Sequence, residues 1–243
     1  MKKAIGYVYV IAAAVCWGFL GLFNRVLTAA GVSLLNMMPL RFGGTAILFT
    51  VFCMMFKQQV FHIKLRHLPI FLGSSLISML LVLCGCALVS GIVGSDVGIS
   101  LEGLLMGLAS ELCYGGYTIF THYGMRYCDS FTMAYWTFLI AGIASLFLAD
   151  GPALLSALAE PRTGLAALGL MVMGTALPFT LYTKGLETVE SGKAAIIANI
   201  EPVMSAVIGV TVFQETLGLW TLVGIVLVLS GVVVLACEKE PDK

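Results

Sequence analysis

Long uninterrupted runs of apolar residues constrain this chain more than any other feature of its sequence. A helix needs about 20 mostly apolar residues to cross the hydrocarbon core of a bilayer. Inside that core only helices and closed barrels satisfy every backbone polar group, and continuous rather than alternating runs favour helices. The sequence predicts an all-α polytopic membrane protein of about eight spans, with residues 5–27, 34–56, 68–93, 101–123, 130–149, 165–186, 193–213 and 218–236.

The composition supports this prediction and limits the classes of function. The chain is 60% hydrophobic and 11% charged, whereas a soluble domain carries roughly 25% charged residues. A net charge of zero argues against a nucleic-acid partner. The connections are too short for an enzyme module, and the three histidines have no metal-ligand spacing. We therefore expect no enzymatic activity, no metal and no cofactor.

The positive charges are distributed unevenly along the predicted spans. If the N-terminus is cytoplasmic, ten of the thirteen Lys and Arg residues fall on the inner side, as basic residues usually do. We expect a multi-pass protein of the plasma membrane with both termini in the cytoplasm. The inner residues are Lys2, Lys3, Lys57, Lys64, Arg66, Arg126, Lys184, Lys193, Lys239 and Lys243.

Two stretches of the chain resemble later stretches. Cys16-Trp17-Gly18 aligns with Cys113-Tyr114-Gly115, and 81–85 aligns with 227–231. The matches predict a shortened unit of three helices (1–93) and a full unit of five (101–243). An odd number of spans inverts the second unit, as in many secondary transporters with a binding site at mid-membrane. The alternative is chance similarity between apolar helices.

Glu201 is the acid that we expect to carry chemistry. It lies near the middle of the seventh span, within Asn199-Ile200-Glu201-Pro202, and burying an unpaired charge there is costly. Pro202 cannot donate to the carbonyl of Ala198, which leaves that acceptor open. These groups suit a proton, a cation or an amine. The alternative is a helix kink in which a neighbouring donor holds Glu201.

Glu111 lies in the middle of the fourth span. It shares a helical face with three polar or small residues, and two tyrosines flank that face. The pattern fits either a water-filled pathway or a buried acid paired with Arg41 or a tyrosine hydroxyl. The companions of Glu111 are Gly115, Thr118 and His122, with Tyr114 and Tyr117 at the sides.

Four further residues complete the candidate site. Arg41 lies about two turns from the outer end of the second span, within reach of water, to attract an anionic group or to pair with an acid. Trp17 either lines a cavity or packs as an ordinary aromatic residue. Pro178 marks a second helix break in the sixth span, with Tyr182 one turn further on.

With these residues identified, the chain resembles the EamA-type transporters of the drug/metabolite transporter superfamily. The strongest match is 193–203, which contains Asn199, Glu201 and Pro202, and it continues through 214–217 to 224–232. Trp17 and Gly18 match the opening of the first repeat. The resemblance implies two five-helix inverted repeats and transport of amino acids, other metabolites or drugs, often outward.

This chain departs from that pattern in its first half, which lacks about two helices. Our leading hypothesis is a secondary transporter, an exporter of small metabolites such as amino acids or amines, that works by alternating access. The partners are then a small-molecule substrate and the lipid bilayer. The alternative is a chain that no longer transports, or one that functions only as a homodimer whose second copy fills the gap.

Overall fold

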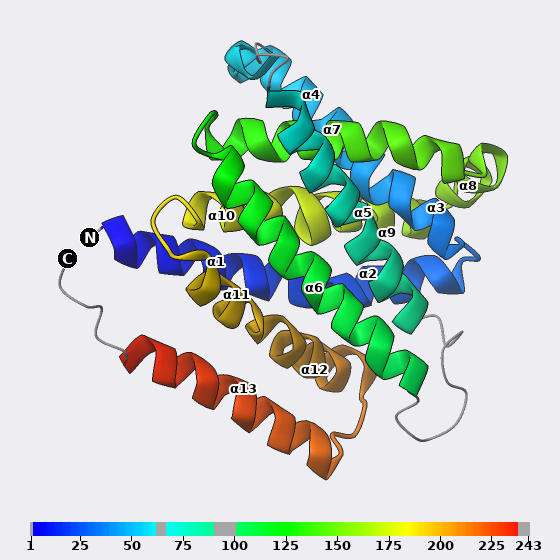
Figure 1. The fold of residues 1–243 in the computed structure, drawn as a ribbon. Helices are drawn as coiled ribbons and strands as arrows, with labels where there is room; N and C mark the ends of the chain where they lie inside the picture. Colours follow the sequence, from blue (N-terminus) through cyan, green and yellow to red (C-terminus); the bar gives the residue numbers. More distant parts are fainter. Residues whose placement is uncertain (1, 62–66, 90–100, 238–243) are drawn as a thin grey trace.

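The computed structural model describes residues 2–61, 67–89 and 101–237, and these residues form helices joined by short turns (Figure 1). The first half contains α1 (Lys2–Gly18), α2 (Leu20–Ala29), α3 (Leu34–Met38), the π-helix η1 (Pro39–Gly44), α4 (Thr45–Phe56), the short 3-10 helix η2 (Gln58–Phe61) and α5 (Leu68–Val89). The first two predicted spans are thus helical but internally interrupted, at Phe19 and at the π-helix.

The second half likewise consists of helices, some of them interrupted by a π-helix or a short turn. It contains α6 (Leu101–Gly124), α7 (Ser130–Ser145), the 3-10 turn η4 (Leu146–Leu148), α8 (Gly151–Leu158), α9 (Pro161–Met171), the π-helix η5 (Val172–Ala176), α10 (Leu177–Gly185), α11 (Ser191–Ala198), α12 (Ile200–Phe213) and α13 (Leu219–Cys237). Each predicted span corresponds to one of these helices or to a broken pair of them. The end of the predicted span 68–93 lies outside the described residues.

The prediction of an all-α polytopic membrane protein is confirmed. Four described segments are long and apolar enough to cross a membrane: Ala4–Ala29, Leu35–Phe56, Pro161–Gly185 and Ser191–Phe213. Shorter apolar helical stretches occur at Leu68–Ile77, Ser130–Ser145 and Thr221–Val233. The structure adds one helix that the sequence did not predict, α8, whose first turn is capped by the carboxylate of Asp150, which accepts from the Ala153 N–H at 3.2 Å.

Small residues allow α1 to lie close to α10. A side chain at Gly6 would collide with Thr188, and a Cβ at Gly185 would lie 2.5 Å from Cγ2 of Val10. Since lipid tails are as apolar as the helices, association within a membrane depends on such close backbone packing. α1 consequently lies inside the bundle, between α10 and the broken pair α11 and α12.

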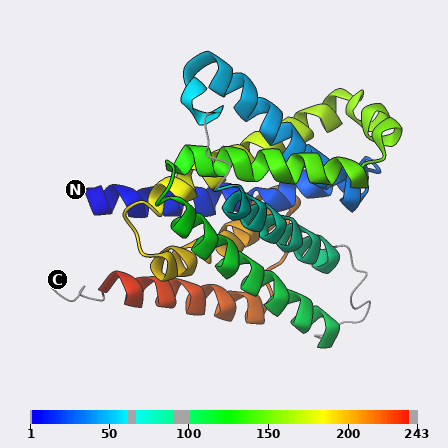
Figure 2. The same cartoon turned by 45° about the horizontal axis from the view of Figure 1, so that its top comes forward.

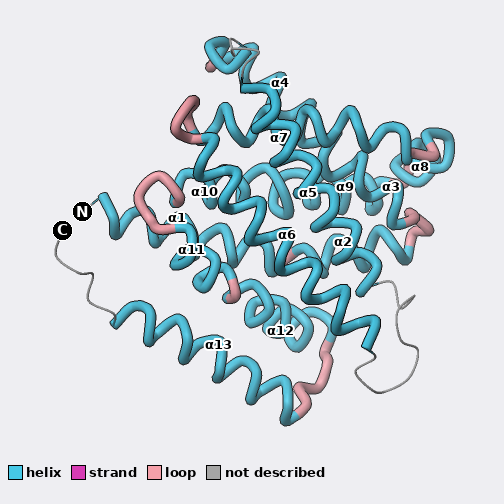
Figure 3. The backbone as a smooth tube through the Cα atoms, in the orientation of Figure 1, coloured by secondary structure: helices cyan, strands magenta, loops and turns pink. Residues whose placement is uncertain are grey.

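The turns gather at two opposite ends of the bundle (Figure 3). We call the end that holds the first residues of α1, the α6–α7 turn and the α10–α11 turn the terminal end. The other, which holds the α2–α3 and α12–α13 turns, we call the distal end. α13 lies at the edge of the bundle in both views (Figures 1 and 2), where it packs against α11 and α12.

Candidate functional site

An aromatic cluster from three helices occupies the interior of the bundle. The Trp17 ring of α1 lies 6.1 Å from the Tyr114 ring of α6, measured between centroids. It lies 5.3 Å from the Tyr182 ring and 5.1 Å from the Phe179 ring, both of α10. The rings of Tyr114 and Tyr182 lie 5.8 Å apart. Trp17 and Tyr182 are buried, at 3% and 0% exposed, and Tyr114 is partly buried.

Helix geometry explains why these side chains converge. Phe179 and Tyr182 are three residues apart, so α10 presents both on one face, and Tyr114 and Thr118, four residues apart, share a face of α6. The glycines of the α1–α10 interface bring Trp17 close to that face. The sequence predicted Trp17, Tyr114, Thr118 and Tyr182 as candidate residues, and the structure brings these four together.

One hydrogen-bond chain links α6 to α10 within the cluster. The hydroxyl of Thr118 donates to the backbone carbonyl of Tyr114 at 3.0 Å. The Thr118 and Tyr182 hydroxyls lie 3.0 Å apart. Because Thr118 has used its single hydrogen, Tyr182 is the donor in that second bond. These two hydrogen bonds hold the Tyr182 hydroxyl in place and use its hydrogen.

Two other polar atoms in the cluster are buried without such a bond. Within the described parts of the chain the indole N–H of Trp17 has no hydrogen-bond partner, and the hydroxyl of Tyr114 interacts with the Tyr182 hydroxyl without reaching good hydrogen-bond geometry. The great majority of buried polar groups in native proteins are hydrogen-bonded, and an exception calls for an explanation. Two donors that remain available beside aromatic rings are the groups that a bound molecule with acceptor atoms would satisfy.

Glu201 approaches the cluster from the broken helix α11–α12. The helix is interrupted at Asn199, whose N–H bonds to the Ile196 carbonyl in a tighter turn, at 3.2 Å. Glu201 lies in the first turn of α12 and is partly buried. Its carboxyl group is within electrostatic reach of Tyr114. One turn later Ser205 donates to the carbonyl of Gly18 at 3.2 Å, so this face of α12 is turned toward α1.

The remaining predicted residues lie apart from the cluster or outside the description. Asn199 is exposed and donates its side-chain amide to the Ala195 carbonyl at 3.3 Å. Arg41 is partly buried in η1, which packs on α7 and α9. Glu111 belongs to α6, but its side chain lies outside the described residues. Pro178 is in the first turn of α10, directly after the π-helix η5.

Phe179 is a member of the cluster that the sequence analysis did not identify. Its ring also lies 4.9 Å from that of Phe138 and 5.4 Å from that of Tyr117, which extends the cluster toward α7. The one signal in the sequence is its spacing, three residues before Tyr182 and next to Pro178. Within the described residues, no group of three or more His, Cys, Asp or Glu side chains is arranged to hold a metal ion.

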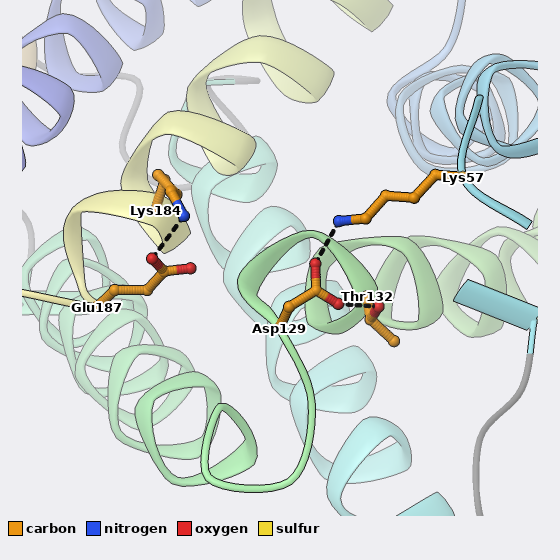
Figure 4. Close-up of polar contacts among 5 residues, drawn as sticks. All are labelled: Lys57, Asp129, Thr132, Lys184 and Glu187. Atoms are coloured by element: carbon orange, nitrogen blue, oxygen red, sulfur yellow. Dashed lines mark hydrogen bonds and ion pairs between the residues drawn. The ribbon is translucent and has the colours of Figure 1, made fainter. Parts of the chain in front are cut away.

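Charged pairs stabilise both ends of the bundle. At the terminal end Lys57 pairs with Asp129, which also accepts from Thr132, and Lys184 pairs with Glu187 at 2.6 Å (Figure 4). Partial burial alone would raise the pKa of Asp129, but the hydrogen bonds from Lys57 and Thr132 and the Lys57 charge lower it below 3.8. At the distal end Arg25 pairs with Glu215 at 2.5 Å. The sequence analysis had not connected any of these residues.

Two curated relatives of the chain are named transporters, and a third is named a multidrug resistance protein. The chain is 26% identical over 170 residues to the uncharacterized transporter YwfM of Bacillus subtilis, which is 69% of this chain and 56% of the relative. It is 41% identical over 68 residues to an uncharacterized transporter of Archaeoglobus fulgidus, 28% of this chain and 25% of the relative. Over 87 residues, 35% of this chain and 74% of the relative, it is 32% identical to the multidrug resistance protein EbrB of Bacillus atrophaeus.

A family model matches one continuous range in the second half of the chain. The chain spans only about half the length of YwfM and a quarter of the archaeal relative. Residues 101–237, more than half of the chain, match the model of the EamA-like transporter family. This range contains the partly buried acid, the broken helix and two of the three helices that form the aromatic cluster. The chain therefore belongs to the EamA-like transporter family.

Proposed function

We propose that the chain is a secondary transporter that exports small amines or amino acids by alternating access. The observation that carries the proposal is the pair of buried donors, on Trp17 and Tyr114, that make no hydrogen bond of good geometry inside an aromatic cluster beside the carboxyl group of Glu201. The donors suit the carboxylate or carbonyl oxygen of a substrate. A protonated amine is attracted both by an acid and by the faces of aromatic rings.

The proposed role of Glu201 follows from its position. It stands in the first turn of α12, beside the break at Asn199 and immediately before Pro202, and broken helices of this kind form the binding sites of many secondary transporters. Partial burial makes its charge sensitive to a partner, so Glu201 exchanges a proton or an amine during the cycle. Arg41 and Glu111 remain predicted contributors, Arg41 toward an anionic group and Glu111 toward a second acid.

The orientation that we propose places the terminal end in the cytoplasm of a cell whose plasma membrane holds the protein. Lys57, Arg126, Lys184 and Lys193 all lie at or next to turns of that end, whereas Arg25 and Arg162 belong to the distal side. The positive-inside rule then assigns the terminal end to the cytoplasm. Both termini of the chain are cytoplasmic in this arrangement.

Uptake and counterflow in proteoliposomes, over a panel of amino acids and amines, test the proposal. We expect Glu201→Gln to reduce transport at least tenfold, because the variant keeps the shape of the side chain and removes the charge. Glu190→Gln is the matched control, since Glu190 is an exposed acid that precedes α11. Full activity in Glu201→Gln, with the control equally active, would contradict the proposed mechanism and leave the family membership intact.

A homodimer is the second candidate for the active form. Two observations favour it. The match to YwfM covers only 56% of that relative, and most side chains of α13 are exposed and could contact a second copy. A second copy would supply the cavity wall that a shortened first half lacks. Crosslinking in native membranes distinguishes the two forms: a band at twice the chain mass supports the dimer, and only monomer at all protein concentrations contradicts it.

A further inference from the structure

Arg25 and Glu215 form an ion pair between parts of the chain that are 190 residues apart. Arg25 belongs to the last part of α2, and Glu215 follows the end of α12. The guanidinium nitrogen lies 2.5 Å from the carboxylate oxygen, and the guanidinium carbon lies 4.4 Å from the centroid of the Phe213 ring. The pair therefore joins α2, which continues the span of α1, to the distal end of α12, which packs against both α1 and α2.

The backbone around Glu215 is shaped for this contact. α12 ends at Gln214, which has φ 55°, and the N–H of Glu215 then bonds back to the carbonyl of Gly209 at 3.1 Å. A Cβ at Gly209 would lie 2.5 Å from the second carboxylate oxygen of Glu215. A left-handed residue, a backward hydrogen bond and a glycine thus fix the direction of one carboxylate.

The terminal end carries a second pair with the same construction. Lys57, directly after α4, pairs with Asp129, directly before α7. The Lys57 ammonium lies 5.0 Å from the centroid of the Phe131 ring, two residues from the acid, as Phe213 is two residues from Glu215. Thr132 also donates to Asp129. In each pair the cation comes from residues 1–93 and the acid and the phenylalanine come from residues 101–243.

The pair Lys184–Glu187 differs from these two in a way that makes it a control. Its partners are three residues apart at the end of α10, so it joins no separate segments. All three pairs have side chains that are between about a third and a half exposed. An exposed pair of this kind is weak enough to break in every cycle and shifts a two-state equilibrium by only about two- to fivefold.

We propose that Arg25–Glu215 and Lys57–Asp129 are latches that close the distal and the terminal end of the bundle, respectively, and that alternate during transport. This inference rests on the proposed transport function. Alternating access requires that the two ends open in turn around one site, and a bistable contact at each end supplies the switch. Both latches are closed in the present structure.

The labelling of one buried cysteine tests the latches without a substrate. Cys16 is 8% exposed, precedes Trp17 and lies about 14 Å along the helix from Arg25. In a protein that retains only this cysteine, a membrane-impermeant maleimide is added to either side of proteoliposomes. We expect Arg25→Glu to raise the labelling rate at least twofold from the distal side only, and Lys57→Glu from the terminal side only. Lys184→Glu should change neither.

A charge exchange separates a latch from a structural contact. Arg25→Glu with Glu215→Arg should return the distal labelling rate to within about twofold of the parent, because the pair is restored with opposite polarity. If Arg25→Glu fails to fold, Arg25→Gln and Glu215→Gln serve in its place, and each should raise the distal labelling rate of Cys16 by a smaller factor. Labelling that increases equally from both sides, or equally in Lys184→Glu, would overturn the inference.

Crosslinks provide the complementary experiment. A short bis-maleimide that joins Arg25→Cys to Glu215→Cys, or Lys57→Cys to Asp129→Cys, should reduce the transport rate at least tenfold. The same crosslink between Lys184→Cys and Glu187→Cys should leave the rate unchanged. Equal transport in all three crosslinked proteins would contradict the latches. If the parent protein moves no substrate at all, the proposed function fails, and the side-specific labelling of Cys16 still decides the latches.

Discussion

Tyr182 of α10 donates its hydroxyl hydrogen to Thr118 of α6 across 3.0 Å, and Thr118 passes its own to the Tyr114 carbonyl. The bond fixes one aromatic ring of the cluster, whereas Tyr114 and Trp17 keep donors that make no hydrogen bond of good geometry. The cluster therefore combines a rigid wall with two groups available to a ligand. This division predicts different outcomes for substitutions that otherwise look alike.

The pair Thr118 and Tyr182 should contribute to stability. Thr118→Val leaves the buried Tyr182 hydroxyl without an acceptor, which costs about 1–3 kcal/mol, and Tyr182→Phe should cost less because Thr118 keeps its bond to the backbone. The coupling between the two substitutions should be about 0.6 kcal/mol, the average for hydrogen bonds in a membrane protein. Unfolding of the four proteins of the double-mutant cycle in mixed micelles measures it. A coupling of zero would show that the bond does not form.

Trp17→Phe should affect binding far more than stability. The substitution keeps an aromatic ring and removes an N–H that has no partner, so the free protein loses no hydrogen bond. Trp136→Phe is the matched control, because the Trp136 N–H donates to the Val60 carbonyl at 2.9 Å and its loss should lower stability by about 1 kcal/mol.

The measurements are the KM for transport and the unfolding midpoint of each variant. We expect Trp17→Phe to raise the KM at least tenfold, since a hydrogen bond to a charged group contributes about 1.5–3 kcal/mol, and to lower the midpoint only by the packing that the smaller ring loses. Trp136→Phe should show the reverse pattern. A KM that is unaffected by Trp17→Phe would remove the indole N–H from the substrate site.

Glycine positions distinguish close packing from open space. A Cβ at Gly142 would lie 2.9 Å from the Cα of Gly43, and backbone atoms cannot move aside as a flexible side chain can. Gly142→Ala should therefore destabilise the protein by about 1–3 kcal/mol. Nothing lies within 4 Å of a Cβ at Gly21, so Gly21→Ala should be neutral or stabilise by up to about 1 kcal/mol. Equal effects of the two substitutions would contradict the observed contact between α7 and η1.

The helices could be predicted from the sequence because apolar runs of membrane-spanning length permit no other structure. α8 escaped prediction for the opposite reason: it has only eight residues, far fewer than a helix needs to cross a membrane. The interruptions at Phe19 and in the π-helices depend on packing between helices. Those contacts join residues far apart in the chain, and no local pattern encodes them.

The candidate site was predicted in part. Trp17 and Tyr114 stood out because each precedes a glycine within one of the two similar stretches, and Tyr182 because it carries a hydroxyl one turn after Pro178. Phe179 did not, since one more phenylalanine in an apolar helix carries no signal. Likewise, Arg25 and Glu215 are 190 residues apart, and only the folded bundle shows that one is the partner of the other.

Two neighbouring residues of the α6–α7 turn, Cys128 and Asp129, have pKa values that are shifted in opposite directions. Burial, with a smaller effect from the Asp129 charge, raises the pKa of the Cys128 thiol to about 11. Lys57 and Thr132 hold the pKa of Asp129 below 3.8 despite its partial burial. A depressed acid pKa stabilises the fold at any pH above 3.8, and this stabilisation is lost as the pH falls through the lower, folded value.

As the pH falls below about 4, the stability of the parent protein should therefore decrease more than that of Asp129→Asn. Thermal unfolding in detergent between pH 3 and 7 compares the midpoints of the two proteins. At pH 8 a thiol of pKa about 11 is roughly 0.1% thiolate, against roughly a quarter for a free cysteine. In a protein that retains only Cys128, alkylation should be at least a hundredfold slower than for a model thiol and should accelerate about tenfold per pH unit up to pH 10. Labelling at the free-thiol rate would show that the turn opens to water. It would also argue against the proposed Lys57–Asp129 latch, because that pair holds the same turn against α4.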